Sequence, residues 1–293
     1  MRILGTGLSG LVGSRIVELL SPKHEFENYS LENGVDITNR DDIISRITGD
    51  TKASWVLHLA AYTNVQGAEA EKTLGEQSAA WKVNVTATEY IIEACVRSGK
   101  RLLYVDTDYA FDGTKQSYTE EDSVHPLGWY AVTKSEGAKR VLALGEKGLV
   151  IRISNPYRAH PVGKKDFAHK MLERFISGQE IIAPADQLFV PTFIDDIATA
   201  VDTLISADAR GIYHVVGSQA ISPFDAAKKI AQVYGYPESL VKPTTFAEYF
   251  ANRAPAPQYA VLVNDKIRAL GVTMRGFDDG ITQVKQSEDS GAA

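Results

Sequence analysis

Three side chains in the middle of this chain could together carry out acid–base chemistry on a carbonyl or an alcohol. Tyr130 and Lys134 stand four residues apart in an expected helix, so they share one face of it. A free phenol has a pKa of about 10. A nearby ammonium favours phenolate and lowers that pKa, which would make Tyr130 a usable acid–base catalyst. Thr107 follows an expected strand, and its hydroxyl could align the substrate oxygen.

A glycine-rich turn at the start of the chain could form a binding site for a dinucleotide. Residues 6–13 read Thr-Gly-Leu-Ser-Gly-Leu-Val-Gly, directly after an expected strand and at the start of an expected helix. Gly7 permits the turn, Gly10 lets a pyrophosphate approach the backbone, and Gly13 allows close packing of helix and strand. Glu32 lies at a tolerable distance for the ribose hydroxyls, and no arginine there marks a 2′-phosphate. These signals leave the choice between NADP and NAD open, and we expect one of the two, with a slight preference for NADP.

Strands alternate with helices through the first half of the chain, which predicts an α/β fold with a Rossmann-type, doubly wound parallel sheet. The expected strands are 2–5, 25–31, 55–61, 101–106, 149–154 and 211–216. The expected helices are 10–20, one from about 38, 79–98, 128–144, 166–177, 194–206 and 222–234. Prolines break up the region after Ser154. We assign residues 1–154 and about 187–216 to an NAD(P)-binding domain and about 155–186 and 217–280 to a smaller C-terminal substrate-binding lobe. Residues 285–293 are expected to form a disordered tail.

Composition narrows the class of protein. The chain has 293 residues, 44% hydrophobic and 23% charged, with a net charge of -6. That balance argues against a nucleic-acid-coating or membrane-coating function. We find no signal peptide and no run of about 18 apolar residues. Cys95 is the single cysteine, so no intrachain disulfide can form. A cytoplasmic protein without nucleic-acid or membrane partners fits best, and a homodimer is considered. The histidines show no metal-ligand spacing, so no metal is expected.

Several segments carry a family resemblance. They are Ala60-Ala-Tyr-Thr-Asn-Val-Gln-Gly-Ala-Glu69, Asn84-Val-Thr-Ala-Thr88, Thr107-Asp-Tyr-Ala-Phe-Asp-Gly113, Pro126-Leu-Gly-Trp-Tyr130 and Lys134-Ser-Glu136. With them the chain resembles an extended short-chain dehydrogenase/reductase, and is most similar to the dTDP-4-dehydrorhamnose reductases. The resemblance implies NAD(P)H-dependent reduction of the 4-keto group of a nucleotide-linked sugar.

The resemblance also implies site residues. Thr107, Tyr130 and Lys134 would be catalytic. The cofactor would contact Gly7, Ser9, Gly10, Leu11, Val12, Gly13, Asp36, Ile37, Ala60, Ala61, Tyr62, Asn84, Tyr130 and Lys134. The nucleotide-sugar substrate would contact Thr107, Asp108, Phe111, Tyr130, Asn155 and Arg253.

The chain departs from the family pattern where the sugar nucleotide should bind. Asp106 replaces the usual serine before Thr107, Asp166 replaces the asparagine before Phe167, and residues 154–158 lack the usual tryptophan. Five cations could bind a diphosphate, or they could form a basic surface exposed to solvent: Arg152, Arg158, Lys164, Lys165 and Arg253.

Two other functions stay open. Asp106 and Asp108 could supply the extra acid–base groups of an NAD-dependent epimerase or dehydratase. A non-catalytic, dinucleotide-binding regulatory subunit is the other alternative, because the methionine adenosyltransferase beta subunit resembles the same reductases.

Overall fold

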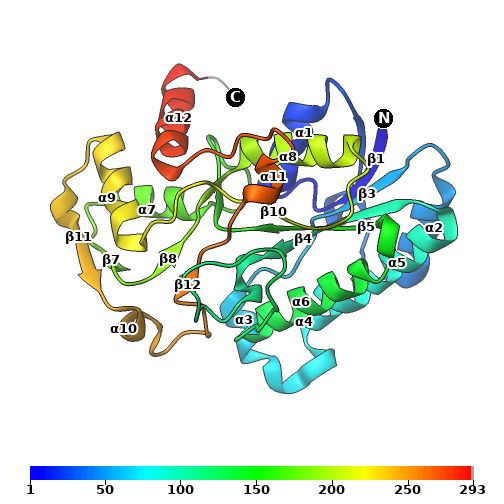
Figure 1. The fold of residues 1–293 in the computed structure, drawn as a ribbon, viewed down its shortest axis with the longest axis horizontal. Helices are drawn as coiled ribbons and strands as arrows, with labels where there is room; N and C mark the ends of the chain where they lie inside the picture. Colours follow the sequence, from blue (N-terminus) through cyan, green and yellow to red (C-terminus); the bar gives the residue numbers. More distant parts are fainter. Residues whose placement is uncertain (292–293) are drawn as a thin grey trace.

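A six-stranded parallel sheet forms the centre of the computed structural model, which describes residues 1–291. Its strands are β1 (Arg2–Thr6), β2 (Glu25–Tyr29), β3 (Trp55–His58), β4 (Arg101–Thr107), β5 (Gly148–Ile153) and β10 (Gly211–His214). They lie in the order β10-β5-β4-β3-β1-β2 (Figure 1). The order reverses between β1 and β3, and open sheets of this kind bind ligands at the carboxyl ends of the strands at such a point. The predicted Rossmann-type fold is confirmed.

Helices cover both faces of this sheet. On one face α1 (Leu11–Leu20), α8 (Ile194–Ser206) and α11 (Asp265–Arg268) pack with Ile3, Leu57 and Leu103 of the sheet. On the other face α2 (Arg40–Gly49), α5 (Ala87–Ser98) and α6 (Trp129–Leu142) pack with Leu4, Val56 and Tyr104. The predicted helices are confirmed at α1, α2, α5, α6 and α8, whereas α11 was not predicted. Asn39 caps α2 by accepting a hydrogen bond from Asp42 N. Buried Cys95 lies on α5.

The long helix expected over 79–98 is interrupted. It begins as α4 (Ala79–Trp81), widens into a π-helical turn, η3 (Lys82–Thr86), and continues as α5 until Gly99, which has a positive φ of 74°. Such turns often occur at functional sites. This one contains the buried side chain of Asn84.

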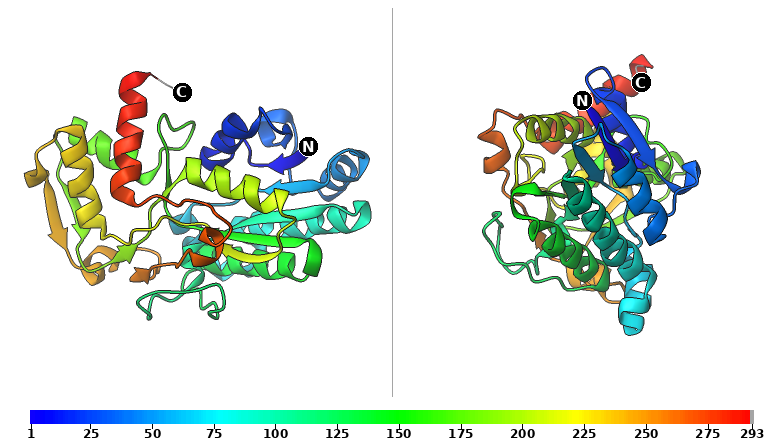
Figure 2. Two further views of the ribbon diagram at one scale, coloured as in Figure 1. Left: turned by 45° about the horizontal axis from the view of Figure 1, so that its top comes forward. Right: turned by 90° about the vertical axis from the view of Figure 1, so that its right-hand side faces the viewer.

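A second, smaller lobe lies beside the carboxyl ends of the strands (Figures 1 and 2). It contains α7 (Phe167–Ile176), β7 (Ile181–Pro184), β8 (Leu188–Phe189), α9 (Pro223–Tyr234), β11 (Val241–Thr244), α10 (Phe246–Phe250) and β12 (Tyr259–Ala260). Two parallel strand pairs, β7 with β11 and β8 with β12, support it. A separate core that includes Tyr157, Phe175 and Phe277 fills it. A third pair, β6 (Pro156–Tyr157) with β9 (Thr192–Phe193), links the chain leaving β5 to the start of α8.

Shorter elements complete the chain. They are η1 (Leu31–Asn33), α3 (Val65–Ala70), η2 (Lys72–Gln77), η4 (Asp108–Ala110), η5 (Gly145–Lys147) and η6 (Glu238–Leu240).

The expected disordered tail is wrong for residues 285–290. They belong to the last helix, α12 (Phe277–Ser290), whose apolar side chains Phe277, Ile281 and Val284 enter the core of the second lobe. Residues 292–293 lie outside the described residues.

Polar contacts also hold α12 in place. His169 of α7 lies between two carboxylates, with Nδ1 2.9 Å from Asp166 Oδ1 and Nε2 2.8 Å from Glu288 Oε1. The Tyr234 hydroxyl donates to the other oxygen of Glu288 at 2.7 Å. Burial alone would lower the pKa of His169, but these carboxylates raise it to about 9. The contact between His169 and Glu288 therefore holds α12 against α7, while Asp166, the N-cap of α7, orients the imidazole.

Candidate active site

The turn between β1 and α1 is built so that only glycine fits at its ends. Gly7 has a positive φ of 71°, and a Cβ there would lie 2.5 Å from Ala60 N. A Cβ on Gly13 would lie 2.4 Å from Gly7 O. Gly10 is exposed and its amide donates to Gly7 O at 3.1 Å. The first turn of α1 carries no acidic residue, so its free N–H groups can hold the phosphates of a dinucleotide.

A cavity of about 1250 Å³ runs from this turn along the carboxyl ends of the strands to α6. Most of the site residues expected from the sequence line it: Gly7, Ser9, Gly10, Leu11, Val12, Gly13, Asp36, Ile37, Ala60, Ala61, Tyr62, Thr107, Asp108, Tyr130, Lys134 and Asn155. Glu32 lines it as well. The cavity thus joins the glycine turn to the three candidate catalytic residues.

Asn84, grouped with the cofactor residues and expected to support the site through the backbone, does not itself line the cavity. Its side-chain oxygen accepts a hydrogen bond from Tyr62 N at 2.8 Å, and its amide donates to Thr133 Oγ1 at 3.0 Å. Because Tyr62 itself lines the cavity, Asn84 supports the cavity wall from behind.

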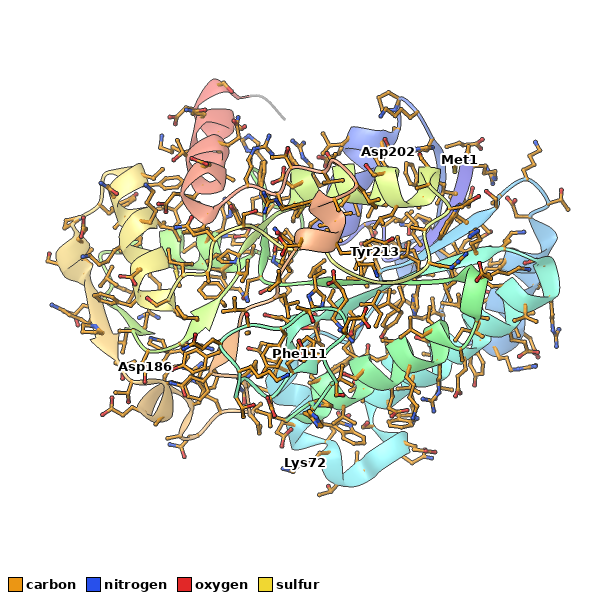
Figure 3. The ribbon with its side chains drawn as sticks, viewed as in Figure 1. Met1, Lys72, Phe111, Asp186, Asp202 and Tyr213 are labelled. Atoms are coloured by element: carbon orange, nitrogen blue, oxygen red, sulfur yellow. The ribbon has the colours of Figure 1, made fainter. Side chains whose placement is uncertain are left out.

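Phe111 is also not where it was expected. Its side chain lies in the interior of the molecule (Figure 3), where it is fully buried. It stacks on Tyr118 with ring centroids 4.3 Å apart and lines neither large cavity. The expectation that Phe111 contacts substrate is therefore wrong. After η4 the chain directs this ring to the interior, where it packs in a small core with Val190, Val216 and Leu262.

Thr107, Tyr130 and Lys134 come together from the end of β4 and the first turns of α6. The Thr107 hydroxyl donates to Asp108 Oδ1 at 3.0 Å and accepts from Tyr109 N at 3.3 Å. Lys134 is 3% exposed, and its ammonium lies 3.9 Å from the centre of the Tyr104 ring. Tyr109 packs edge-on against Tyr130 with ring centroids 6.3 Å apart.

The charges of these groups differ from the expectation. Burial raises the pKa of Tyr130, and a hydrogen bond with Thr107 opposes that shift. Burial also lowers the pKa of Lys134 to about 8, although the Asp106 carboxylate acts in the opposite direction. The predicted lowering of the Tyr130 pKa by Lys134 is not found, because burial outweighs the opposing effects; the Lys134 ammonium lies over the Tyr104 ring. Tyr130 is therefore a neutral phenol at pH 7, which is the form that donates a proton.

Asp108 is a second unusual acid beside the site. It is buried and accepts hydrogen bonds from Thr107 and from Ser154 Oγ, the latter at 2.6 Å. Burial raises the pKa of Asp108 to about 6, and these hydrogen bonds act against the rise. Both carboxylate oxygens are engaged within the protein.

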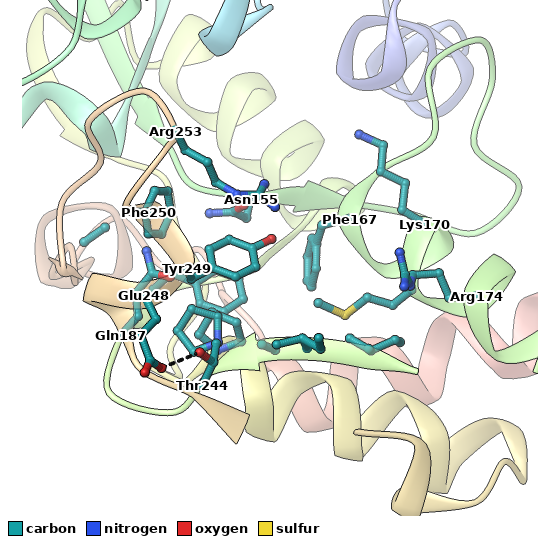
Figure 4. Close-up of a pocket in the computed structure, with 18 of the residues that line it drawn as sticks. Asn155, Phe167, Lys170, Arg174, Gln187, Thr244, Glu248, Tyr249, Phe250 and Arg253 are labelled. Carbon is teal, nitrogen blue, oxygen red and sulfur yellow. Dashed lines mark hydrogen bonds between the residues drawn. The ribbon is translucent and has the colours of Figure 1, made fainter. Parts of the chain in front are cut away.

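A second cavity, of about 650 Å³, opens between the sheet edge and the smaller lobe. Lys170 and Arg174 of α7 lie on one side of it, and Glu248, Tyr249 and Arg253 lie on the other (Figure 4). The guanidinium of Arg253 stands 4.1 Å from the centre of the Tyr249 ring. Five residues line both cavities, which are therefore continuous: Asp108, Tyr109, Asn155, Phe167 and Lys170.

The five cations that could bind a diphosphate do not lie together in the structure. Arg152 and Arg158 are buried in ion pairs, Arg152 with Asp106 and Arg158 with Glu18. Lys164 and Lys165 line the larger cavity, and Arg253 lines the smaller one. Two cations of the smaller cavity, Lys170 and Arg174, were not anticipated. Phe167, Lys170 and Arg174 follow one another at spacings of three and four residues. On the expected helix, this spacing would have placed the two cations on the same face as Phe167.

Among residues 1–291, no group of three or more His, Cys, Asp and Glu side chains could hold a metal ion. Over the same residues no helix has the length and apolar content that crossing a membrane requires.

Comparison with known proteins adds sequence relatives. The profile of the family described as RmlD substrate binding domain matches residues 1–289. A dTDP-4-dehydrorhamnose reductase of Aggregatibacter actinomycetemcomitans is 34% identical over 85% of this chain and 86% of its own. A dTDP-4-keto-6-deoxy-D-glucose reductase of Streptomyces niveus is 28% identical over 96% of both chains.

Solved structures agree with these relatives. The dTDP-4-dehydrorhamnose reductase of Bacillus anthracis, in complex with NADP, superposes with a TM-score of 0.87 at 27% identity, covering 97% of this chain and 98% of its own. A Thermus thermophilus UDP-glucose 4-epimerase in complex with NAD has a TM-score of 0.82 at 22% identity over the full length of both chains, which shows the shared fold alone. The chain belongs to the dTDP-4-dehydrorhamnose reductase family of extended short-chain dehydrogenases/reductases.

Proposed function

We propose that this protein reduces the 4-keto group of a nucleotide-linked deoxysugar with NADPH or NADH, as a dTDP-4-dehydrorhamnose reductase. One observation carries the proposal: the cavity that starts at the glycine turn and the cavity of the smaller lobe meet beside Thr107 and Tyr130. A dinucleotide in the first and a sugar nucleotide in the second would bring their reactive ends together at these hydroxyls.

The residues present fit a dinucleotide. The glycine turn leaves no room for a Cβ at Gly7 or Gly13, and the N-terminus of α1 faces the cavity. Glu32 and Asp36 would lie at the adenosine end, and Lys134 at the nicotinamide end, where its ammonium can hold the ribose. When bound, the cofactor supplies a hydride to the carbonyl carbon.

Tyr130 supplies the proton. Its raised pKa keeps it protonated at neutral pH, and the alkoxide that develops on the substrate is a far stronger base than phenolate. Thr107 aligns the same oxygen, for which its hydroxyl must turn away from Asp108 Oδ1. Two donors would then meet the developing negative charge.

Each of the two aspartates that an epimerase or dehydratase could use already has a partner within the protein. Asp106 pairs with Arg152, and Asp108 accepts from Ser154 and Thr107. This favours the reductase over the two-step alternatives.

The test follows NADPH or NADH oxidation with dTDP-4-dehydrorhamnose and a panel of other 4-keto sugar nucleotides. Tyr130→Phe should lower kcat about 10²-fold to 10⁴-fold, the range for losing a general acid. Tyr213→Phe, a tyrosine of β10 outside both cavities, is the matched control and should keep wild-type activity. Wild-type turnover no faster than that of Tyr130→Phe would refute the proposal.

We also propose that the protein acts in the cytoplasm as a homodimer. Buried Cys95 needs no oxidising compartment, and burial raises the pKa of its thiol to about 12, which keeps it unreactive. Light scattering on the purified protein and fractionation of the native cell test the two statements.

A further inference from the structure

Asp106 occupies a buried position directly before the candidate catalytic Thr107. Side chains alternate along a strand, so Asp106 shares a face of β4 with Leu102 and Tyr104, the face that α5 and α6 cover. The register pairs Asp106 with Arg152 of β5. The Asp106 side chain is 1% exposed and that of Arg152 is 4% exposed.

Arg152 binds only one of the two carboxylate oxygens that Asp106 offers. Its Nε donates to Asp106 Oδ2 at 3.1 Å, and its guanidinium carbon lies 5.0 Å from the centre of the Phe111 ring. Its Nη1 is 3.4 Å from His214 Nε2. Burial and the charge of Arg152 lower the pKa of His214 to about 3, so His214 is a neutral acceptor whose Nδ1 can donate to Val263 O.

The other oxygen, Asp106 Oδ1, is buried and has no hydrogen-bond partner among residues 1–291. An unpaired buried carboxylate oxygen is costly, and each such group in a folded protein calls for an explanation. Asp106 lines the larger cavity together with Tyr130 and Lys134. The unsatisfied acceptor therefore belongs to the site and not to a remote part of the core.

Lys134 is a buried donor in the wall of the same cavity, and the Asp106 charge is close enough to raise its pKa against the effect of burial. Its ammonium rests on the ring of Tyr104, two residues before Asp106 on the same face of β4 and roughly 7 Å away along the strand. The flexible four-carbon stem of lysine lets the ammonium move from the ring toward the carboxylate.

We propose that Asp106 is a positioning residue for Lys134: Oδ1 accepts a hydrogen bond from the Lys134 ammonium in the cofactor-loaded protein, while Oδ2 stays on Arg152. The shared carboxylate aims the ammonium at the cavity and keeps it charged in a buried place. This inference rests on the proposed function, in which Lys134 holds the cofactor.

The sign of the pH dependence follows from the groups around Lys134. His58 of β3 and Tyr104 of β4 are both buried; burial lowers the pKa of His58 to about 3 and raises that of Tyr104, so both are neutral at pH 7. Tyr130 on the same helix is neutral as well. Asp106 is the carboxylate that favours the charged lysine, whose pKa is about 8. Loss of the Asp106 charge moves the loss of the ammonium to lower pH.

The experiment measures NADPH affinity by fluorescence between pH 6 and 9.5, with no turnover needed. Wild-type affinity should weaken as Lys134 loses its proton above about pH 8. Asp106→Asn, which keeps the shape of the side chain, should bind within twofold of wild type at pH 6 and about tenfold more weakly at pH 8. Asp106→Glu should restore most of the affinity at pH 8.

Controls separate this role from a structural one. Asp41→Asn removes the same charge at an exposed place and should follow the wild-type curve. In a Lys134→Met background, Asp106→Asn should have no further effect at any pH. If Asp106→Asn does not fold, the double variant Asp106→Asn, Arg152→Gln removes both buried charges and takes its place.

Three outcomes would overturn the inference: a loss that is equal at every pH, a loss that persists in the Lys134→Met background, or a wild-type protein that binds neither NADPH nor NADH. A protein that shows the expected pH dependence but reduces no 4-keto sugar nucleotide would refute the proposed function and leave the role of Asp106 intact.

Discussion

Two of the three glycines of the first turn, Gly10 and Gly13, should fail in different ways when each is replaced by alanine. Gly13→Ala places a methyl group 2.4 Å from Gly7 O and 2.6 Å from the Cα of Leu8. Both are backbone atoms, so α1 would have to withdraw by about 1 Å to restore an ordinary contact of 3.4 Å. Overpacking of this kind costs about 1–3 kcal/mol. For a chain of 293 residues we expect Gly13→Ala to melt about 2–5 °C lower without ligand.

Gly10→Ala is the matched partner. Its methyl group would meet only Gly7 O, at 3.2 Å, and Gly10 has an extended backbone that alanine adopts freely. Stability without ligand should therefore change by less than about 0.5 kcal/mol. The methyl group nevertheless enters the cavity floor where the diphosphate must approach the backbone. Losing one charge-assisted hydrogen bond is worth about 2 kcal/mol, which is about 30-fold in affinity.

Thermal melting of the free proteins and fluorescence titration with NADPH measure both effects. Gly10→Ala should lose affinity but not melting temperature, and Gly13→Ala should lose melting temperature. Wild-type affinity in Gly10→Ala would mean that the diphosphate does not rest on this turn. An unchanged melting temperature in Gly13→Ala would mean that the helix is free to withdraw.

Three further predictions concern charged groups. Burial raises the pKa of Asp108 to about 6, so folding favours its protonated form. As the pH rises from 4 to 7, wild type should lose about 2–3 kcal/mol of unfolding free energy relative to Asp108→Asn, measured by urea unfolding. Parallel curves of unfolding free energy against pH for the two proteins would contradict this. The pKa of His169, raised to about 9, gives stability that is complete below pH 6.5 and lost as the pH rises through 9; His169→Gln should lack that loss, and hydrogen exchange should show a looser α12 at pH 7. Lys164 donates to Thr63 Oγ1 at 3.2 Å at the wall of the larger cavity; Lys164→Ala should weaken NADPH binding threefold to fivefold, whereas Lys165→Ala, whose ammonium pairs with Glu173, should change it less.

The first half of the fold could be predicted because its signals are local. Buried strands and amphipathic helices alternate there, and turn residues such as Gly99 mark the boundaries. The two-residue strand pairs of the smaller lobe, such as β8 with β12, are too short to show any periodicity. Helix α12 was misread because its polar end resembles a disordered tail, although Phe277, Ile281 and Val284 form a helical stripe.

The sequence indicated which residues line the glycine turn and the sheet edge, but not their charges or the cations of the smaller cavity. The sequence order placed Thr107, Tyr130 and Lys134 correctly at one sheet edge, since parallel strands end on the same side. Arg152 is not a free cation because the register of β4 and β5 pairs it with Asp106. The two residues are 46 positions apart, and the sequence around each gives no sign of this pairing. The direction of the Phe111 ring depends likewise on tertiary packing.

The chain passes between the two lobes several times. After β5 it enters the smaller lobe, returns for α8 and β10, leaves again for α9 to β12, comes back for α11 and ends in α12. Neither lobe is thus formed by one continuous segment of the sequence. A single segment could therefore not be expressed alone as a lobe, nor replaced by the corresponding segment of a relative. Changes in substrate preference have to arise by substitutions within an intact scaffold, at wall positions such as Lys170 or Tyr249.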